Sequence, residues 1–211
     1  MRIAFLGHGN VGAPLADRLQ RLGHPVSLAT SDAGSDSVKK AHLRNPQLKV
    51  AAPREAVAGA DVVFLATPFQ ANGEVLKGVA AELAGKILVD CTNPVGAGLR
   101  HGLESRESGS QAVQRLAPAA RVVKAFSIYG FENFEDNRYP AHAVKPAMMF
   151  CGDDAAAKKT VGELVAQLGW EPVDVGGLEQ ALHLEHMTLL WVRMVRVNGA
   201  SPHMVWARLR R

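Results

Sequence analysis

The sequence is poor in features that mark secreted, membrane or zinc-binding proteins. Its two cysteines, Cys91 and Cys151, lie far apart in apolar stretches, which is typical of reduced, buried thiols and not of a disulfide framework. No set of cysteines and histidines has the spacing of a zinc site, so we expect no bound metal. The apolar runs fall far below the roughly 18 residues that cross a membrane. The first run, at residues 3–6, is too short for a signal peptide, and we expect a cytoplasmic protein without a membrane partner.

Long runs of one charge are absent as well. The formal net charge is +4, and much of the positive excess lies near the C-terminus, at Arg193, Arg196, Arg208, Arg210 and Arg211. This basic end is either a solvated terminus or a surface for an anionic ligand or a partner subunit. Basic patches interleaved with aromatic residues are absent elsewhere, which argues against a nucleic-acid partner.

Short apolar segments alternate with helical segments along most of the 211 residues. The apolar segments predict strands at 2–6, 25–29, 48–51, 61–66, 86–90, 121–126, 147–152 and 171–176. The helical patterns predict helices at 11–22, 37–44, 74–83, 112–116, 153–169 and 178–198, with a short one that begins at Pro53. Such alternation predicts an α/β fold of the Rossmann type, with a doubly wound, mostly parallel sheet covered on both faces.

We expect two parts: a nucleotide-binding domain at residues 1–176 and a small C-terminal helical extension at residues 177–211. One face of the last helix is apolar and carries Leu184, Met187, Leu190, Trp191, Met194 and Val195. That face either packs on the sheet or pairs two subunits into a homodimer. The segment 92–110 is rich in glycine and serine, and it is either a binding loop or lid, or a mobile surface insertion.

A glycine-rich stretch between the first predicted strand and the first predicted helix fits the pattern G-x-G-x-x-G. It consists of Gly7, His8, Gly9, Asn10, Val11 and Gly12. The first glycine permits a tight turn, the second lets a pyrophosphate approach the backbone, and the third lets the helix pack closely on the sheet. Free N–H groups at the start of the helix then face the phosphates. In this context the motif predicts a dinucleotide site.

The end of the second predicted strand bears on which dinucleotide binds. Thr30 and Ser31 place two hydroxyls beside the adenosine ribose, which suits a 2′-phosphate, and Lys39 or Lys40 adds positive charge. Asp32 favours the opposite choice, because a carboxylate about 20 residues past the motif holds the ribose 2′-OH of NAD. The sequence favours NADP(H). The histidine of the glycine motif faces either the 2′-phosphate or solvent.

Threonine, asparagine and proline follow two further predicted strands. Thr67 and Pro68 come after one of them, and Asn93 and Pro94 come shortly after the next. Ligands on parallel sheets bind beyond the carboxyl ends of the strands, so we expect these four residues to line a nicotinamide pocket. The alternative is that they form ordinary proline-containing turns.

Several stretches together resemble the coenzyme F420-dependent NADP oxidoreductase family. They include RIAFLGHGNVG, DCTNPV, VVKAFSIYGFENF at 122–134 and the block at 151–191. The NADPH-binding domain of the STEAP metalloreductases is similar as well. The resemblance implies a cleft in which a deazaflavin stacks on the nicotinamide, and reversible hydride transfer between NADPH and F420. Family members often carry an arginine directly after the second strand, where this chain has Ser31 and Asp32.

The resemblance also implies roles for individual residues. Residues 7–12 would hold the pyrophosphate, and Thr30 and Ser31 would contact the 2′-phosphate. Thr67, Pro68, Asn93 and Pro94 would flank the nicotinamide.

We therefore expect an NADP(H)-dependent oxidoreductase whose partner is a small-molecule electron acceptor, F420 or a flavin. Hydride transfer between two stacked rings needs little acid–base help, and we assign no catalytic residue. His183 and His186 on the last helix are either proton donors or solvated side chains. The alternatives are an NADPH-dependent reductase of a flavin, a quinone or ferric iron, and a non-catalytic NADP(H)-binding sensor.

Overall fold

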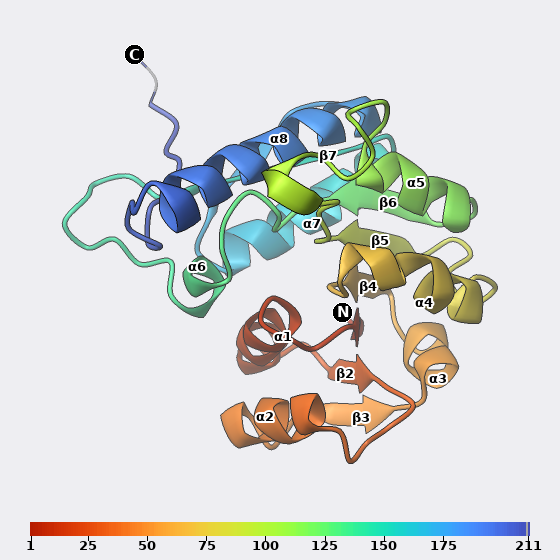
Figure 1. Ribbon diagram of the computed structural model, residues 1–211. Coiled ribbons are helices and arrows are strands. Elements are labelled where there is room, and N and C mark those ends of the chain that lie inside the picture. The colour runs from red at the N-terminus through yellow and green to blue at the C-terminus, as the bar shows by residue number, and fades with distance from the viewer. Residues whose placement is uncertain (210) are drawn as a thin grey trace.

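The sheet has the strand order of a dinucleotide-binding fold. The computed structural model describes residues 1–209 and 211, and the eight strands within them run in the order β3-β2-β1-β4-β5-β6-β7-β8 (Figure 1). The strands are β1 (Ile3–Leu6), β2 (Val26–Ala29), β3 (Lys49–Ala51), β4 (Val62–Leu65), β5 (Ile87–Asp90), β6 (Arg121–Lys124), β7 (Ala147–Gly152) and β8 (Glu171–Asp174). Neighbouring strands pair in parallel, except that β7 runs antiparallel to β6. The first six strands follow the Rossmann order, which confirms the predicted fold class.

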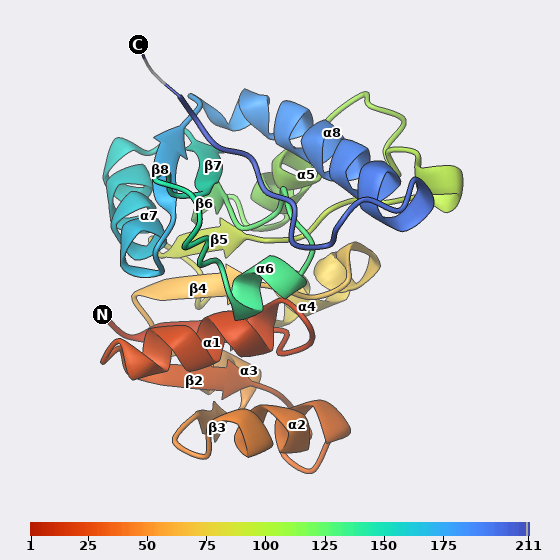
Figure 2. The same cartoon turned by 90° about the vertical axis from the view of Figure 1, so that its left-hand side faces the viewer.

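Helices cover both faces of this sheet. They are α1 (Gly12–Arg21), α2 (Asp36–Arg44), α3 (Pro53–Ala58), α4 (Asn72–Val79), α5 (Gly109–Leu116), α6 (Glu132–Glu135), α7 (Ala155–Gln167) and α8 (Ala181–Val192). Figures 1 and 2 show α1, α6 and α7 on one face, and α3, α4 and α5 on the other. Within residues 1–209 and 211, no helix has both the length and the apolar character needed to span a bilayer.

The central strands β1 and β4 are apolar throughout because alternate side chains enter two separate cores. In β1, Ile3 and Phe5 join the core that contains α1 and α7, whereas Ala4 and Leu6 join the core under α3, α4 and α5. The rings of Phe5 and Phe64 stack with their centroids 4.6 Å apart. A strand buried on both faces reads as a continuous apolar run, which is why periodicity of two is missing from the sequence.

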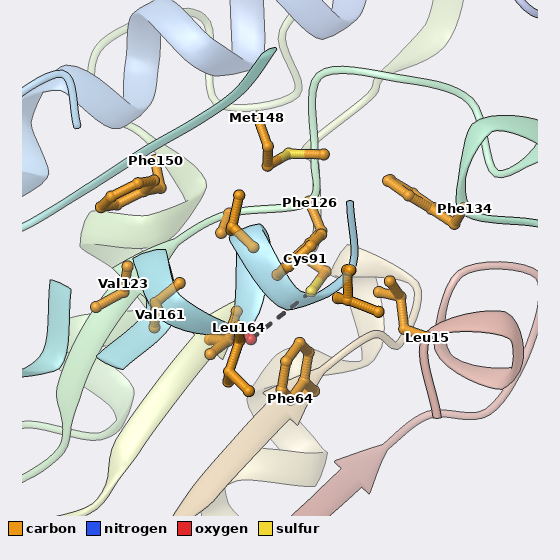
Figure 3. Close-up of a cluster of buried hydrophobic side chains, with 14 of the residues drawn as sticks. Leu15, Phe64, Cys91, Val123, Phe126, Phe134, Met148, Phe150, Val161 and Leu164 are labelled. Carbon is orange, nitrogen blue, oxygen red and sulfur yellow. Dashed lines mark hydrogen bonds between the residues drawn. The ribbon is translucent and has the colours of Figure 1, made fainter. Parts of the chain in front are cut away.

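Cys91 lies in the middle of the larger core, between Phe64 and Phe126 (Figure 3). Its thiol contacts the carbonyl oxygen of Val89 at 3.9 Å. Both cysteines are free and buried, and burial raises the pKa of each thiol. This agrees with the prediction of reduced thiols that pack as apolar side chains.

The last helix differs from the sequence prediction in its extent and in its buried face. A 3₁₀ turn at Leu178–Gln180 precedes α8, and a π-helical turn at Arg193–Val197 follows it. Leu184 and Trp191 are buried as predicted, but Leu190 is 51% exposed. The polar side chains of Glu185 and Thr188 lie on the buried side instead. Leu190 therefore does not pack on the sheet, because polar partners there, which the helical pattern cannot show, select the inward face of α8. The alternative, that Leu190 pairs two subunits, stays a prediction.

The segment 92–110 is organised by local contacts. It contains a 3₁₀ turn at Ala97–Leu99 and an antiparallel bridge between Val95 and His101. Helix α5 begins three residues before the predicted start, because Ser108 and Gln111 form a reciprocal capping box with its first turn. Residues 92–110 therefore adopt a defined, hydrogen-bonded structure beside the ends of β4 and β5.

A fully buried ion cluster ties α8 to this edge of the sheet. Lys124 is 0% exposed, and its ammonium lies 3.1 Å from Glu185 Oε1 and 3.4 Å from Asp90 Oδ2. Although burial alone lowers the pKa of Lys124, the two carboxylates raise it above its ordinary value, so Lys124 is charged. Glu185 also accepts hydrogen bonds from the backbone N–H of Gly109 at 3.0 Å and from His101 Nε2 at 2.7 Å.

These contacts join three elements. They connect β6, the start of α5 and the C-terminal helix through one carboxylate, that of Glu185. The tautomer of His101 is set by its other nitrogen, because Nδ1 accepts from the backbone N–H groups of Leu103 and Ser105. Nε2 of His101 therefore carries the proton that is donated to Glu185.

We predict that Lys124→Met destabilises the protein by about 3–5 kcal/mol, because it leaves two buried carboxylates without their cation. Urea unfolding followed by circular dichroism measures this change. The matched control is Lys39→Met, since Lys39 forms only an exposed pair with Asp36 at 3.5 Å and should cost less than about 1 kcal/mol. Equal midpoints for the two variants would contradict the proposed role of the cluster.

Candidate functional site

The glycine motif forms a bend that admits no side chain at two of its three glycines. Gly7 has a φ of +94°, and a Cβ there would lie 2.6 Å from the backbone carbon and oxygen of Ala66. A Cβ on Gly12 would lie 2.1 Å from the carbonyl oxygen of Gly7. A Cβ on Gly9 would meet nothing within 4 Å. The structure thus explains Gly7 and Gly12 by packing, and it leaves open space at Gly9, where a ligand can approach the backbone.

The start of α1 faces the same open space. The helix has ten residues, its N-cap residue Val11 makes no side-chain capping bond, and its first turn carries no acidic residue. The N–H of Ala13 donates to the carbonyl oxygen of Gly9 at 3.0 Å, and Pro14 has no N–H. The N–H of Gly12 and the positive end of the helix dipole therefore remain for an external anion. Together with the open backbone at Gly9, this arrangement fits a pyrophosphate.

A cavity of about 650 Å³ lies at the carboxyl ends of β1 to β4. It brings together five of the residues that the sequence selected: Gly7, His8, Thr30, Ser31 and Thr67. The other lining residues are Leu6, Ala29, Ala52, Pro53, Arg54, Glu74, Val75, Gly78 and Val79. A cavity of this size, at the point where the strand order reverses, is the place where Rossmann sheets bind nucleotides.

The loop after β2 turns its carboxylate away from this cavity. Asp32 Oδ1 accepts a hydrogen bond from the backbone N–H of Gly34 at 2.9 Å, and Asp32 does not line the cavity. Thr30 Oγ1 bonds to the backbone N–H and C=O of Asp32, at 3.1 Å each. Ser31 is exposed beside the cavity. The NAD-type carboxylate that the sequence left as an alternative is therefore held within its own loop.

Arg54 is a cation at the cavity that sequence reasoning missed. It lies in the first turn of α3, directly after the end of β3, and its side chain is 75% exposed. Its Nε donates to the carbonyl oxygen of Gly78 at 3.0 Å, which holds the guanidinium along the α4 wall of the cavity. Because β2 and β3 are adjacent and parallel, residues that follow them meet at one edge. The signal was a basic residue directly after the third predicted strand.

The predicted nicotinamide residues lie beyond the carboxyl ends of β4 and β5. Thr67 and Asn93 are hydrogen-bonded to different neighbours. Thr67 Oγ1 donates to Asn72 Oδ1 at 2.8 Å. The side chain of Asn93 donates to the carbonyl oxygen of Ser127 at 3.1 Å, and its oxygen accepts from Thr188 Oγ1 at 3.1 Å. The four residues thus share an edge but not one cavity.

The two prolines lie apart from each other. Pro94 lines a neighbouring cavity of about 390 Å³ with Phe69 and Asn72, whereas Pro68 is exposed and precedes the 3₁₀ turn at Phe69–Ala71.

Thr188 on α8 also reaches this edge, which no local sequence pattern indicates. The single proton of its hydroxyl has several acceptors within reach, Asn93 Oδ1 at 3.1 Å and the carbonyl oxygen of Ser127 at 2.9 Å among them. Ser127 is 2% exposed, and its own hydroxyl has no hydrogen-bond partner within residues 1–209 and 211. A buried hydroxyl beside the Asn93 amide is the kind of group that a carboxamide would satisfy.

The histidines and the basic end lie elsewhere. His183 is exposed, and His186 Nε2 bonds to Ser105 Oγ at 2.9 Å, outside the large cavity. Two of the C-terminal arginines are paired within the chain, Arg196 with Glu132 and Arg208 with Glu171. These contacts take up part of the charge that the sequence left for an anionic ligand or partner.

Comparison with known proteins agrees with this site. Residues 2–94 match the family described as "NADP oxidoreductase coenzyme F420-dependent". A crystal structure from Arthrobacter sp. FB24, provisionally described as an F420-dependent NADP reductase, is 30% identical, with both chains covered completely and a TM-score of 0.88. The F420-dependent NADP reductase of Methanocaldococcus jannaschii is 29% identical over 91% of each chain.

A second group of relatives is longer. Metalloreductase STEAP3 of Rattus norvegicus is 32% identical over 89% of this chain, but the chain spans only 36% of that protein. The strand order and the family match place the chain in a class of NADP-dependent oxidoreductases with a dinucleotide-binding fold. The chain belongs to the coenzyme F420-dependent NADP oxidoreductase family.

We predict that Gly9→Ala leaves the stability of the ligand-free protein unchanged and weakens NADPH binding about tenfold or more, because the added methyl group occupies only the space of the pyrophosphate. Thermal melts with and without NADPH, and calorimetric titration, measure the two effects. Gly73→Ala is the control, since a Cβ there also meets nothing within 4 Å, and it should leave binding intact. Undiminished NADPH binding by Gly9→Ala would refute this placement of the pyrophosphate.

Gly7→Ala should behave differently. Its methyl group meets the backbone of Ala66 and the residue must keep a φ of +94°, so we expect a loss of stability before any ligand is added. The same thermal melts without nucleotide test this, and a melting temperature equal to that of the native protein would contradict the packing described above.

Proposed function

We propose that the protein transfers hydride between NADPH and a deazaflavin of the F420 type. The observation that carries the nucleotide half of this proposal is the open backbone at Gly9 below the start of α1, beside a cavity of about 650 Å³. The choice of an F420-type acceptor is supported by two relatives that are described as F420-dependent NADP reductases. They align with this chain over 91% and 92% of both sequences. Bound NADPH would supply the hydride.

The residues of the chain would bind and orient the nucleotide. Gly9 and the N–H groups at the start of α1 would hold the pyrophosphate. Ser31 and Arg54 would hold the 2′-phosphate, so that Arg54 replaces the arginine that family members often carry after the second strand. Thr67 and Asn93 would position the nicotinamide ring.

Helix α8 would complete the site at the carboxyl ends of the strands. In this proposal residues 1–176 bind the nucleotide, and residues 177–211 brace the acceptor side through α8. The hydrogen bond from Thr188 to Asn93, at 3.1 Å, fixes one of the nicotinamide residues from that helix. Hydride transfer between stacked rings needs little acid–base help, so no side chain is assigned a role in proton transfer.

A ferric or flavin reductase is the second candidate, because the metalloreductase relatives match 89% of this chain. Stopped-flow oxidation of NADPH by F420, by FMN, by a ferric chelate and without acceptor separates the two. We expect F420 to give the fastest oxidation. Faster oxidation by FMN or the ferric chelate would favour the second candidate, and no acceleration by any acceptor would contradict an enzyme of this type.

The assignment of the 2′-phosphate to Arg54 has its own test. Arg54→Gln should raise the Kd for NADPH about tenfold, since one charge-assisted bond to a phosphate is lost, and should change the Kd for NADH less than about twofold. Arg115→Gln is the control, because Arg115 pairs with Glu107 on α5 and lies outside the cavity. An equal loss for both nucleotides would show that Arg54 contacts another part of the cofactor.

A further inference from the structure

His8 lies between the phosphate-binding bend and the end of β2. It is the second residue of the glycine motif, and its ring points to α2, where Nε2 bonds to Ser37 Oγ at 2.9 Å. It lines the large cavity together with Thr30 and Ser31. It also lines a smaller cavity of about 280 Å³ on the α2 side of the bend. The ring is therefore on the ribose side of the site, where a 2′-phosphate would lie.

The imidazole is incompletely satisfied without a ligand. Its Nδ1 is shielded from solvent and has no hydrogen-bond partner within residues 1–209 and 211. If Nε2 accepts from Ser37, Nδ1 carries a proton without an acceptor; if Nε2 donates to Ser37, Nδ1 is an acceptor without a donor. In both tautomers one nitrogen is unmatched, and a phosphate oxygen would satisfy the protonated form.

Charged groups face His8 from four helices. Through the smaller cavity these are Lys40 and Arg44 of α2 and Glu135 of α6. Through the large cavity they are Arg54 of α3 and Glu74 of α4. Arg44 and Glu135 pair with each other, with Arg44 Nη2 and Glu135 Oε1 2.6 Å apart.

Burial of the ring favours the neutral form of His8 in the empty site. His8 is half-buried, and desolvation lowers its pKa below the ordinary value. A bound dianionic phosphate reverses the balance, because it adds a strong negative charge within reach of the ring.

We propose that His8 takes up a proton when the nucleotide binds, and that the resulting imidazolium holds the 2′-phosphate together with Ser31 and Arg54. This inference rests on the proposed NADP(H) site and adds a pH-dependent choice between NADPH and NADH. The proton comes from solvent and remains on the ring while the nucleotide is bound. Two cations then hold the phosphate, Arg54 permanently and His8 only when the phosphate is present.

The sign of the effect follows from linkage. A group whose pKa is higher in the complex than in the free protein binds a proton on association, so affinity is lost as pH rises through the pKa of the complex. The phosphate itself, with a second pKa of about 6, is already ionised above pH 7. Between pH 7 and pH 9 the Kd for NADPH should therefore rise about tenfold, and the Kd for NADH should change less than about twofold.

Calorimetric titration with NADPH in two buffers of different ionisation enthalpy, HEPES and Tris at pH 7.5, measures the proton uptake directly. We expect a substantial fraction of a proton per NADPH for the native protein and for His142→Asn, whose histidine is exposed far from the motif. We expect none for His8→Asn, together with about a tenfold higher Kd at pH 7 and a flat pH profile.

The outcomes are separable. Equal proton uptake by native protein and His8→Asn, or the same uptake on saturation with NADH, would overturn the role of His8 while leaving nucleotide binding intact. No heat with NADPH or NADH from any variant would instead overturn the proposed function. Thermal melts of ligand-free His8→Asn and native protein check that the substitution leaves the fold intact.

Discussion

The bend at Gly7 packs directly against the backbone that leaves β4, and there is no room for a side chain between them. This contact fixes where the chain leaves β1 and therefore where α1 begins. Because Gly12 is pressed on the carbonyl of Gly7 in turn, the first turn of the helix cannot rotate away from the sheet edge. The start of α1 is held over the strand ends, and the open backbone at Gly9 lies beside it.

At the β5–β6 side of the sheet edge, the position of α8 depends on buried charged side chains. Asp90, Lys124 and Glu185 bring β5, β6 and α8 together in a region without solvent, and Asp90 also accepts from Ser110 Oγ at 2.5 Å. A buried ion cluster adds little net stability compared with an apolar core, but it specifies one arrangement of its partners. Here it sets the position of α8, from which Thr188 reaches Asn93.

Much of the nucleotide half could be predicted from the sequence. The glycine motif lies between a strand and a helix, and the strand ends at Thr67 and Asn93 follow apolar runs, so local patterns were enough to place them on one edge. Leu190 and Glu185 show the limit of such patterns. The inward face of α8 is set by Lys124, which is distant in sequence, and helical periodicity assigns a leucine inward and a glutamate outward.

Arg54 was missed, and Asp32 was left as an alternative, for a related reason. Distance from the glycine motif suggested Asp32, yet its carboxylate is used by the N–H of Gly34, two residues away. Arg54 lies at the cavity because β3 is the spatial neighbour of β2, which sequence separation from the motif does not express. Local side-chain bonds and strand adjacency decided both cases.

A crystal structure of the protein with NADPH tests the central claim most directly. We expect the pyrophosphate within hydrogen-bond distance of the backbone N–H groups at the start of α1, with the 2′-phosphate between Ser31 and Arg54. A nucleotide bound at another edge of the sheet, or a 2′-phosphate that projects into solvent away from both side chains, would contradict it.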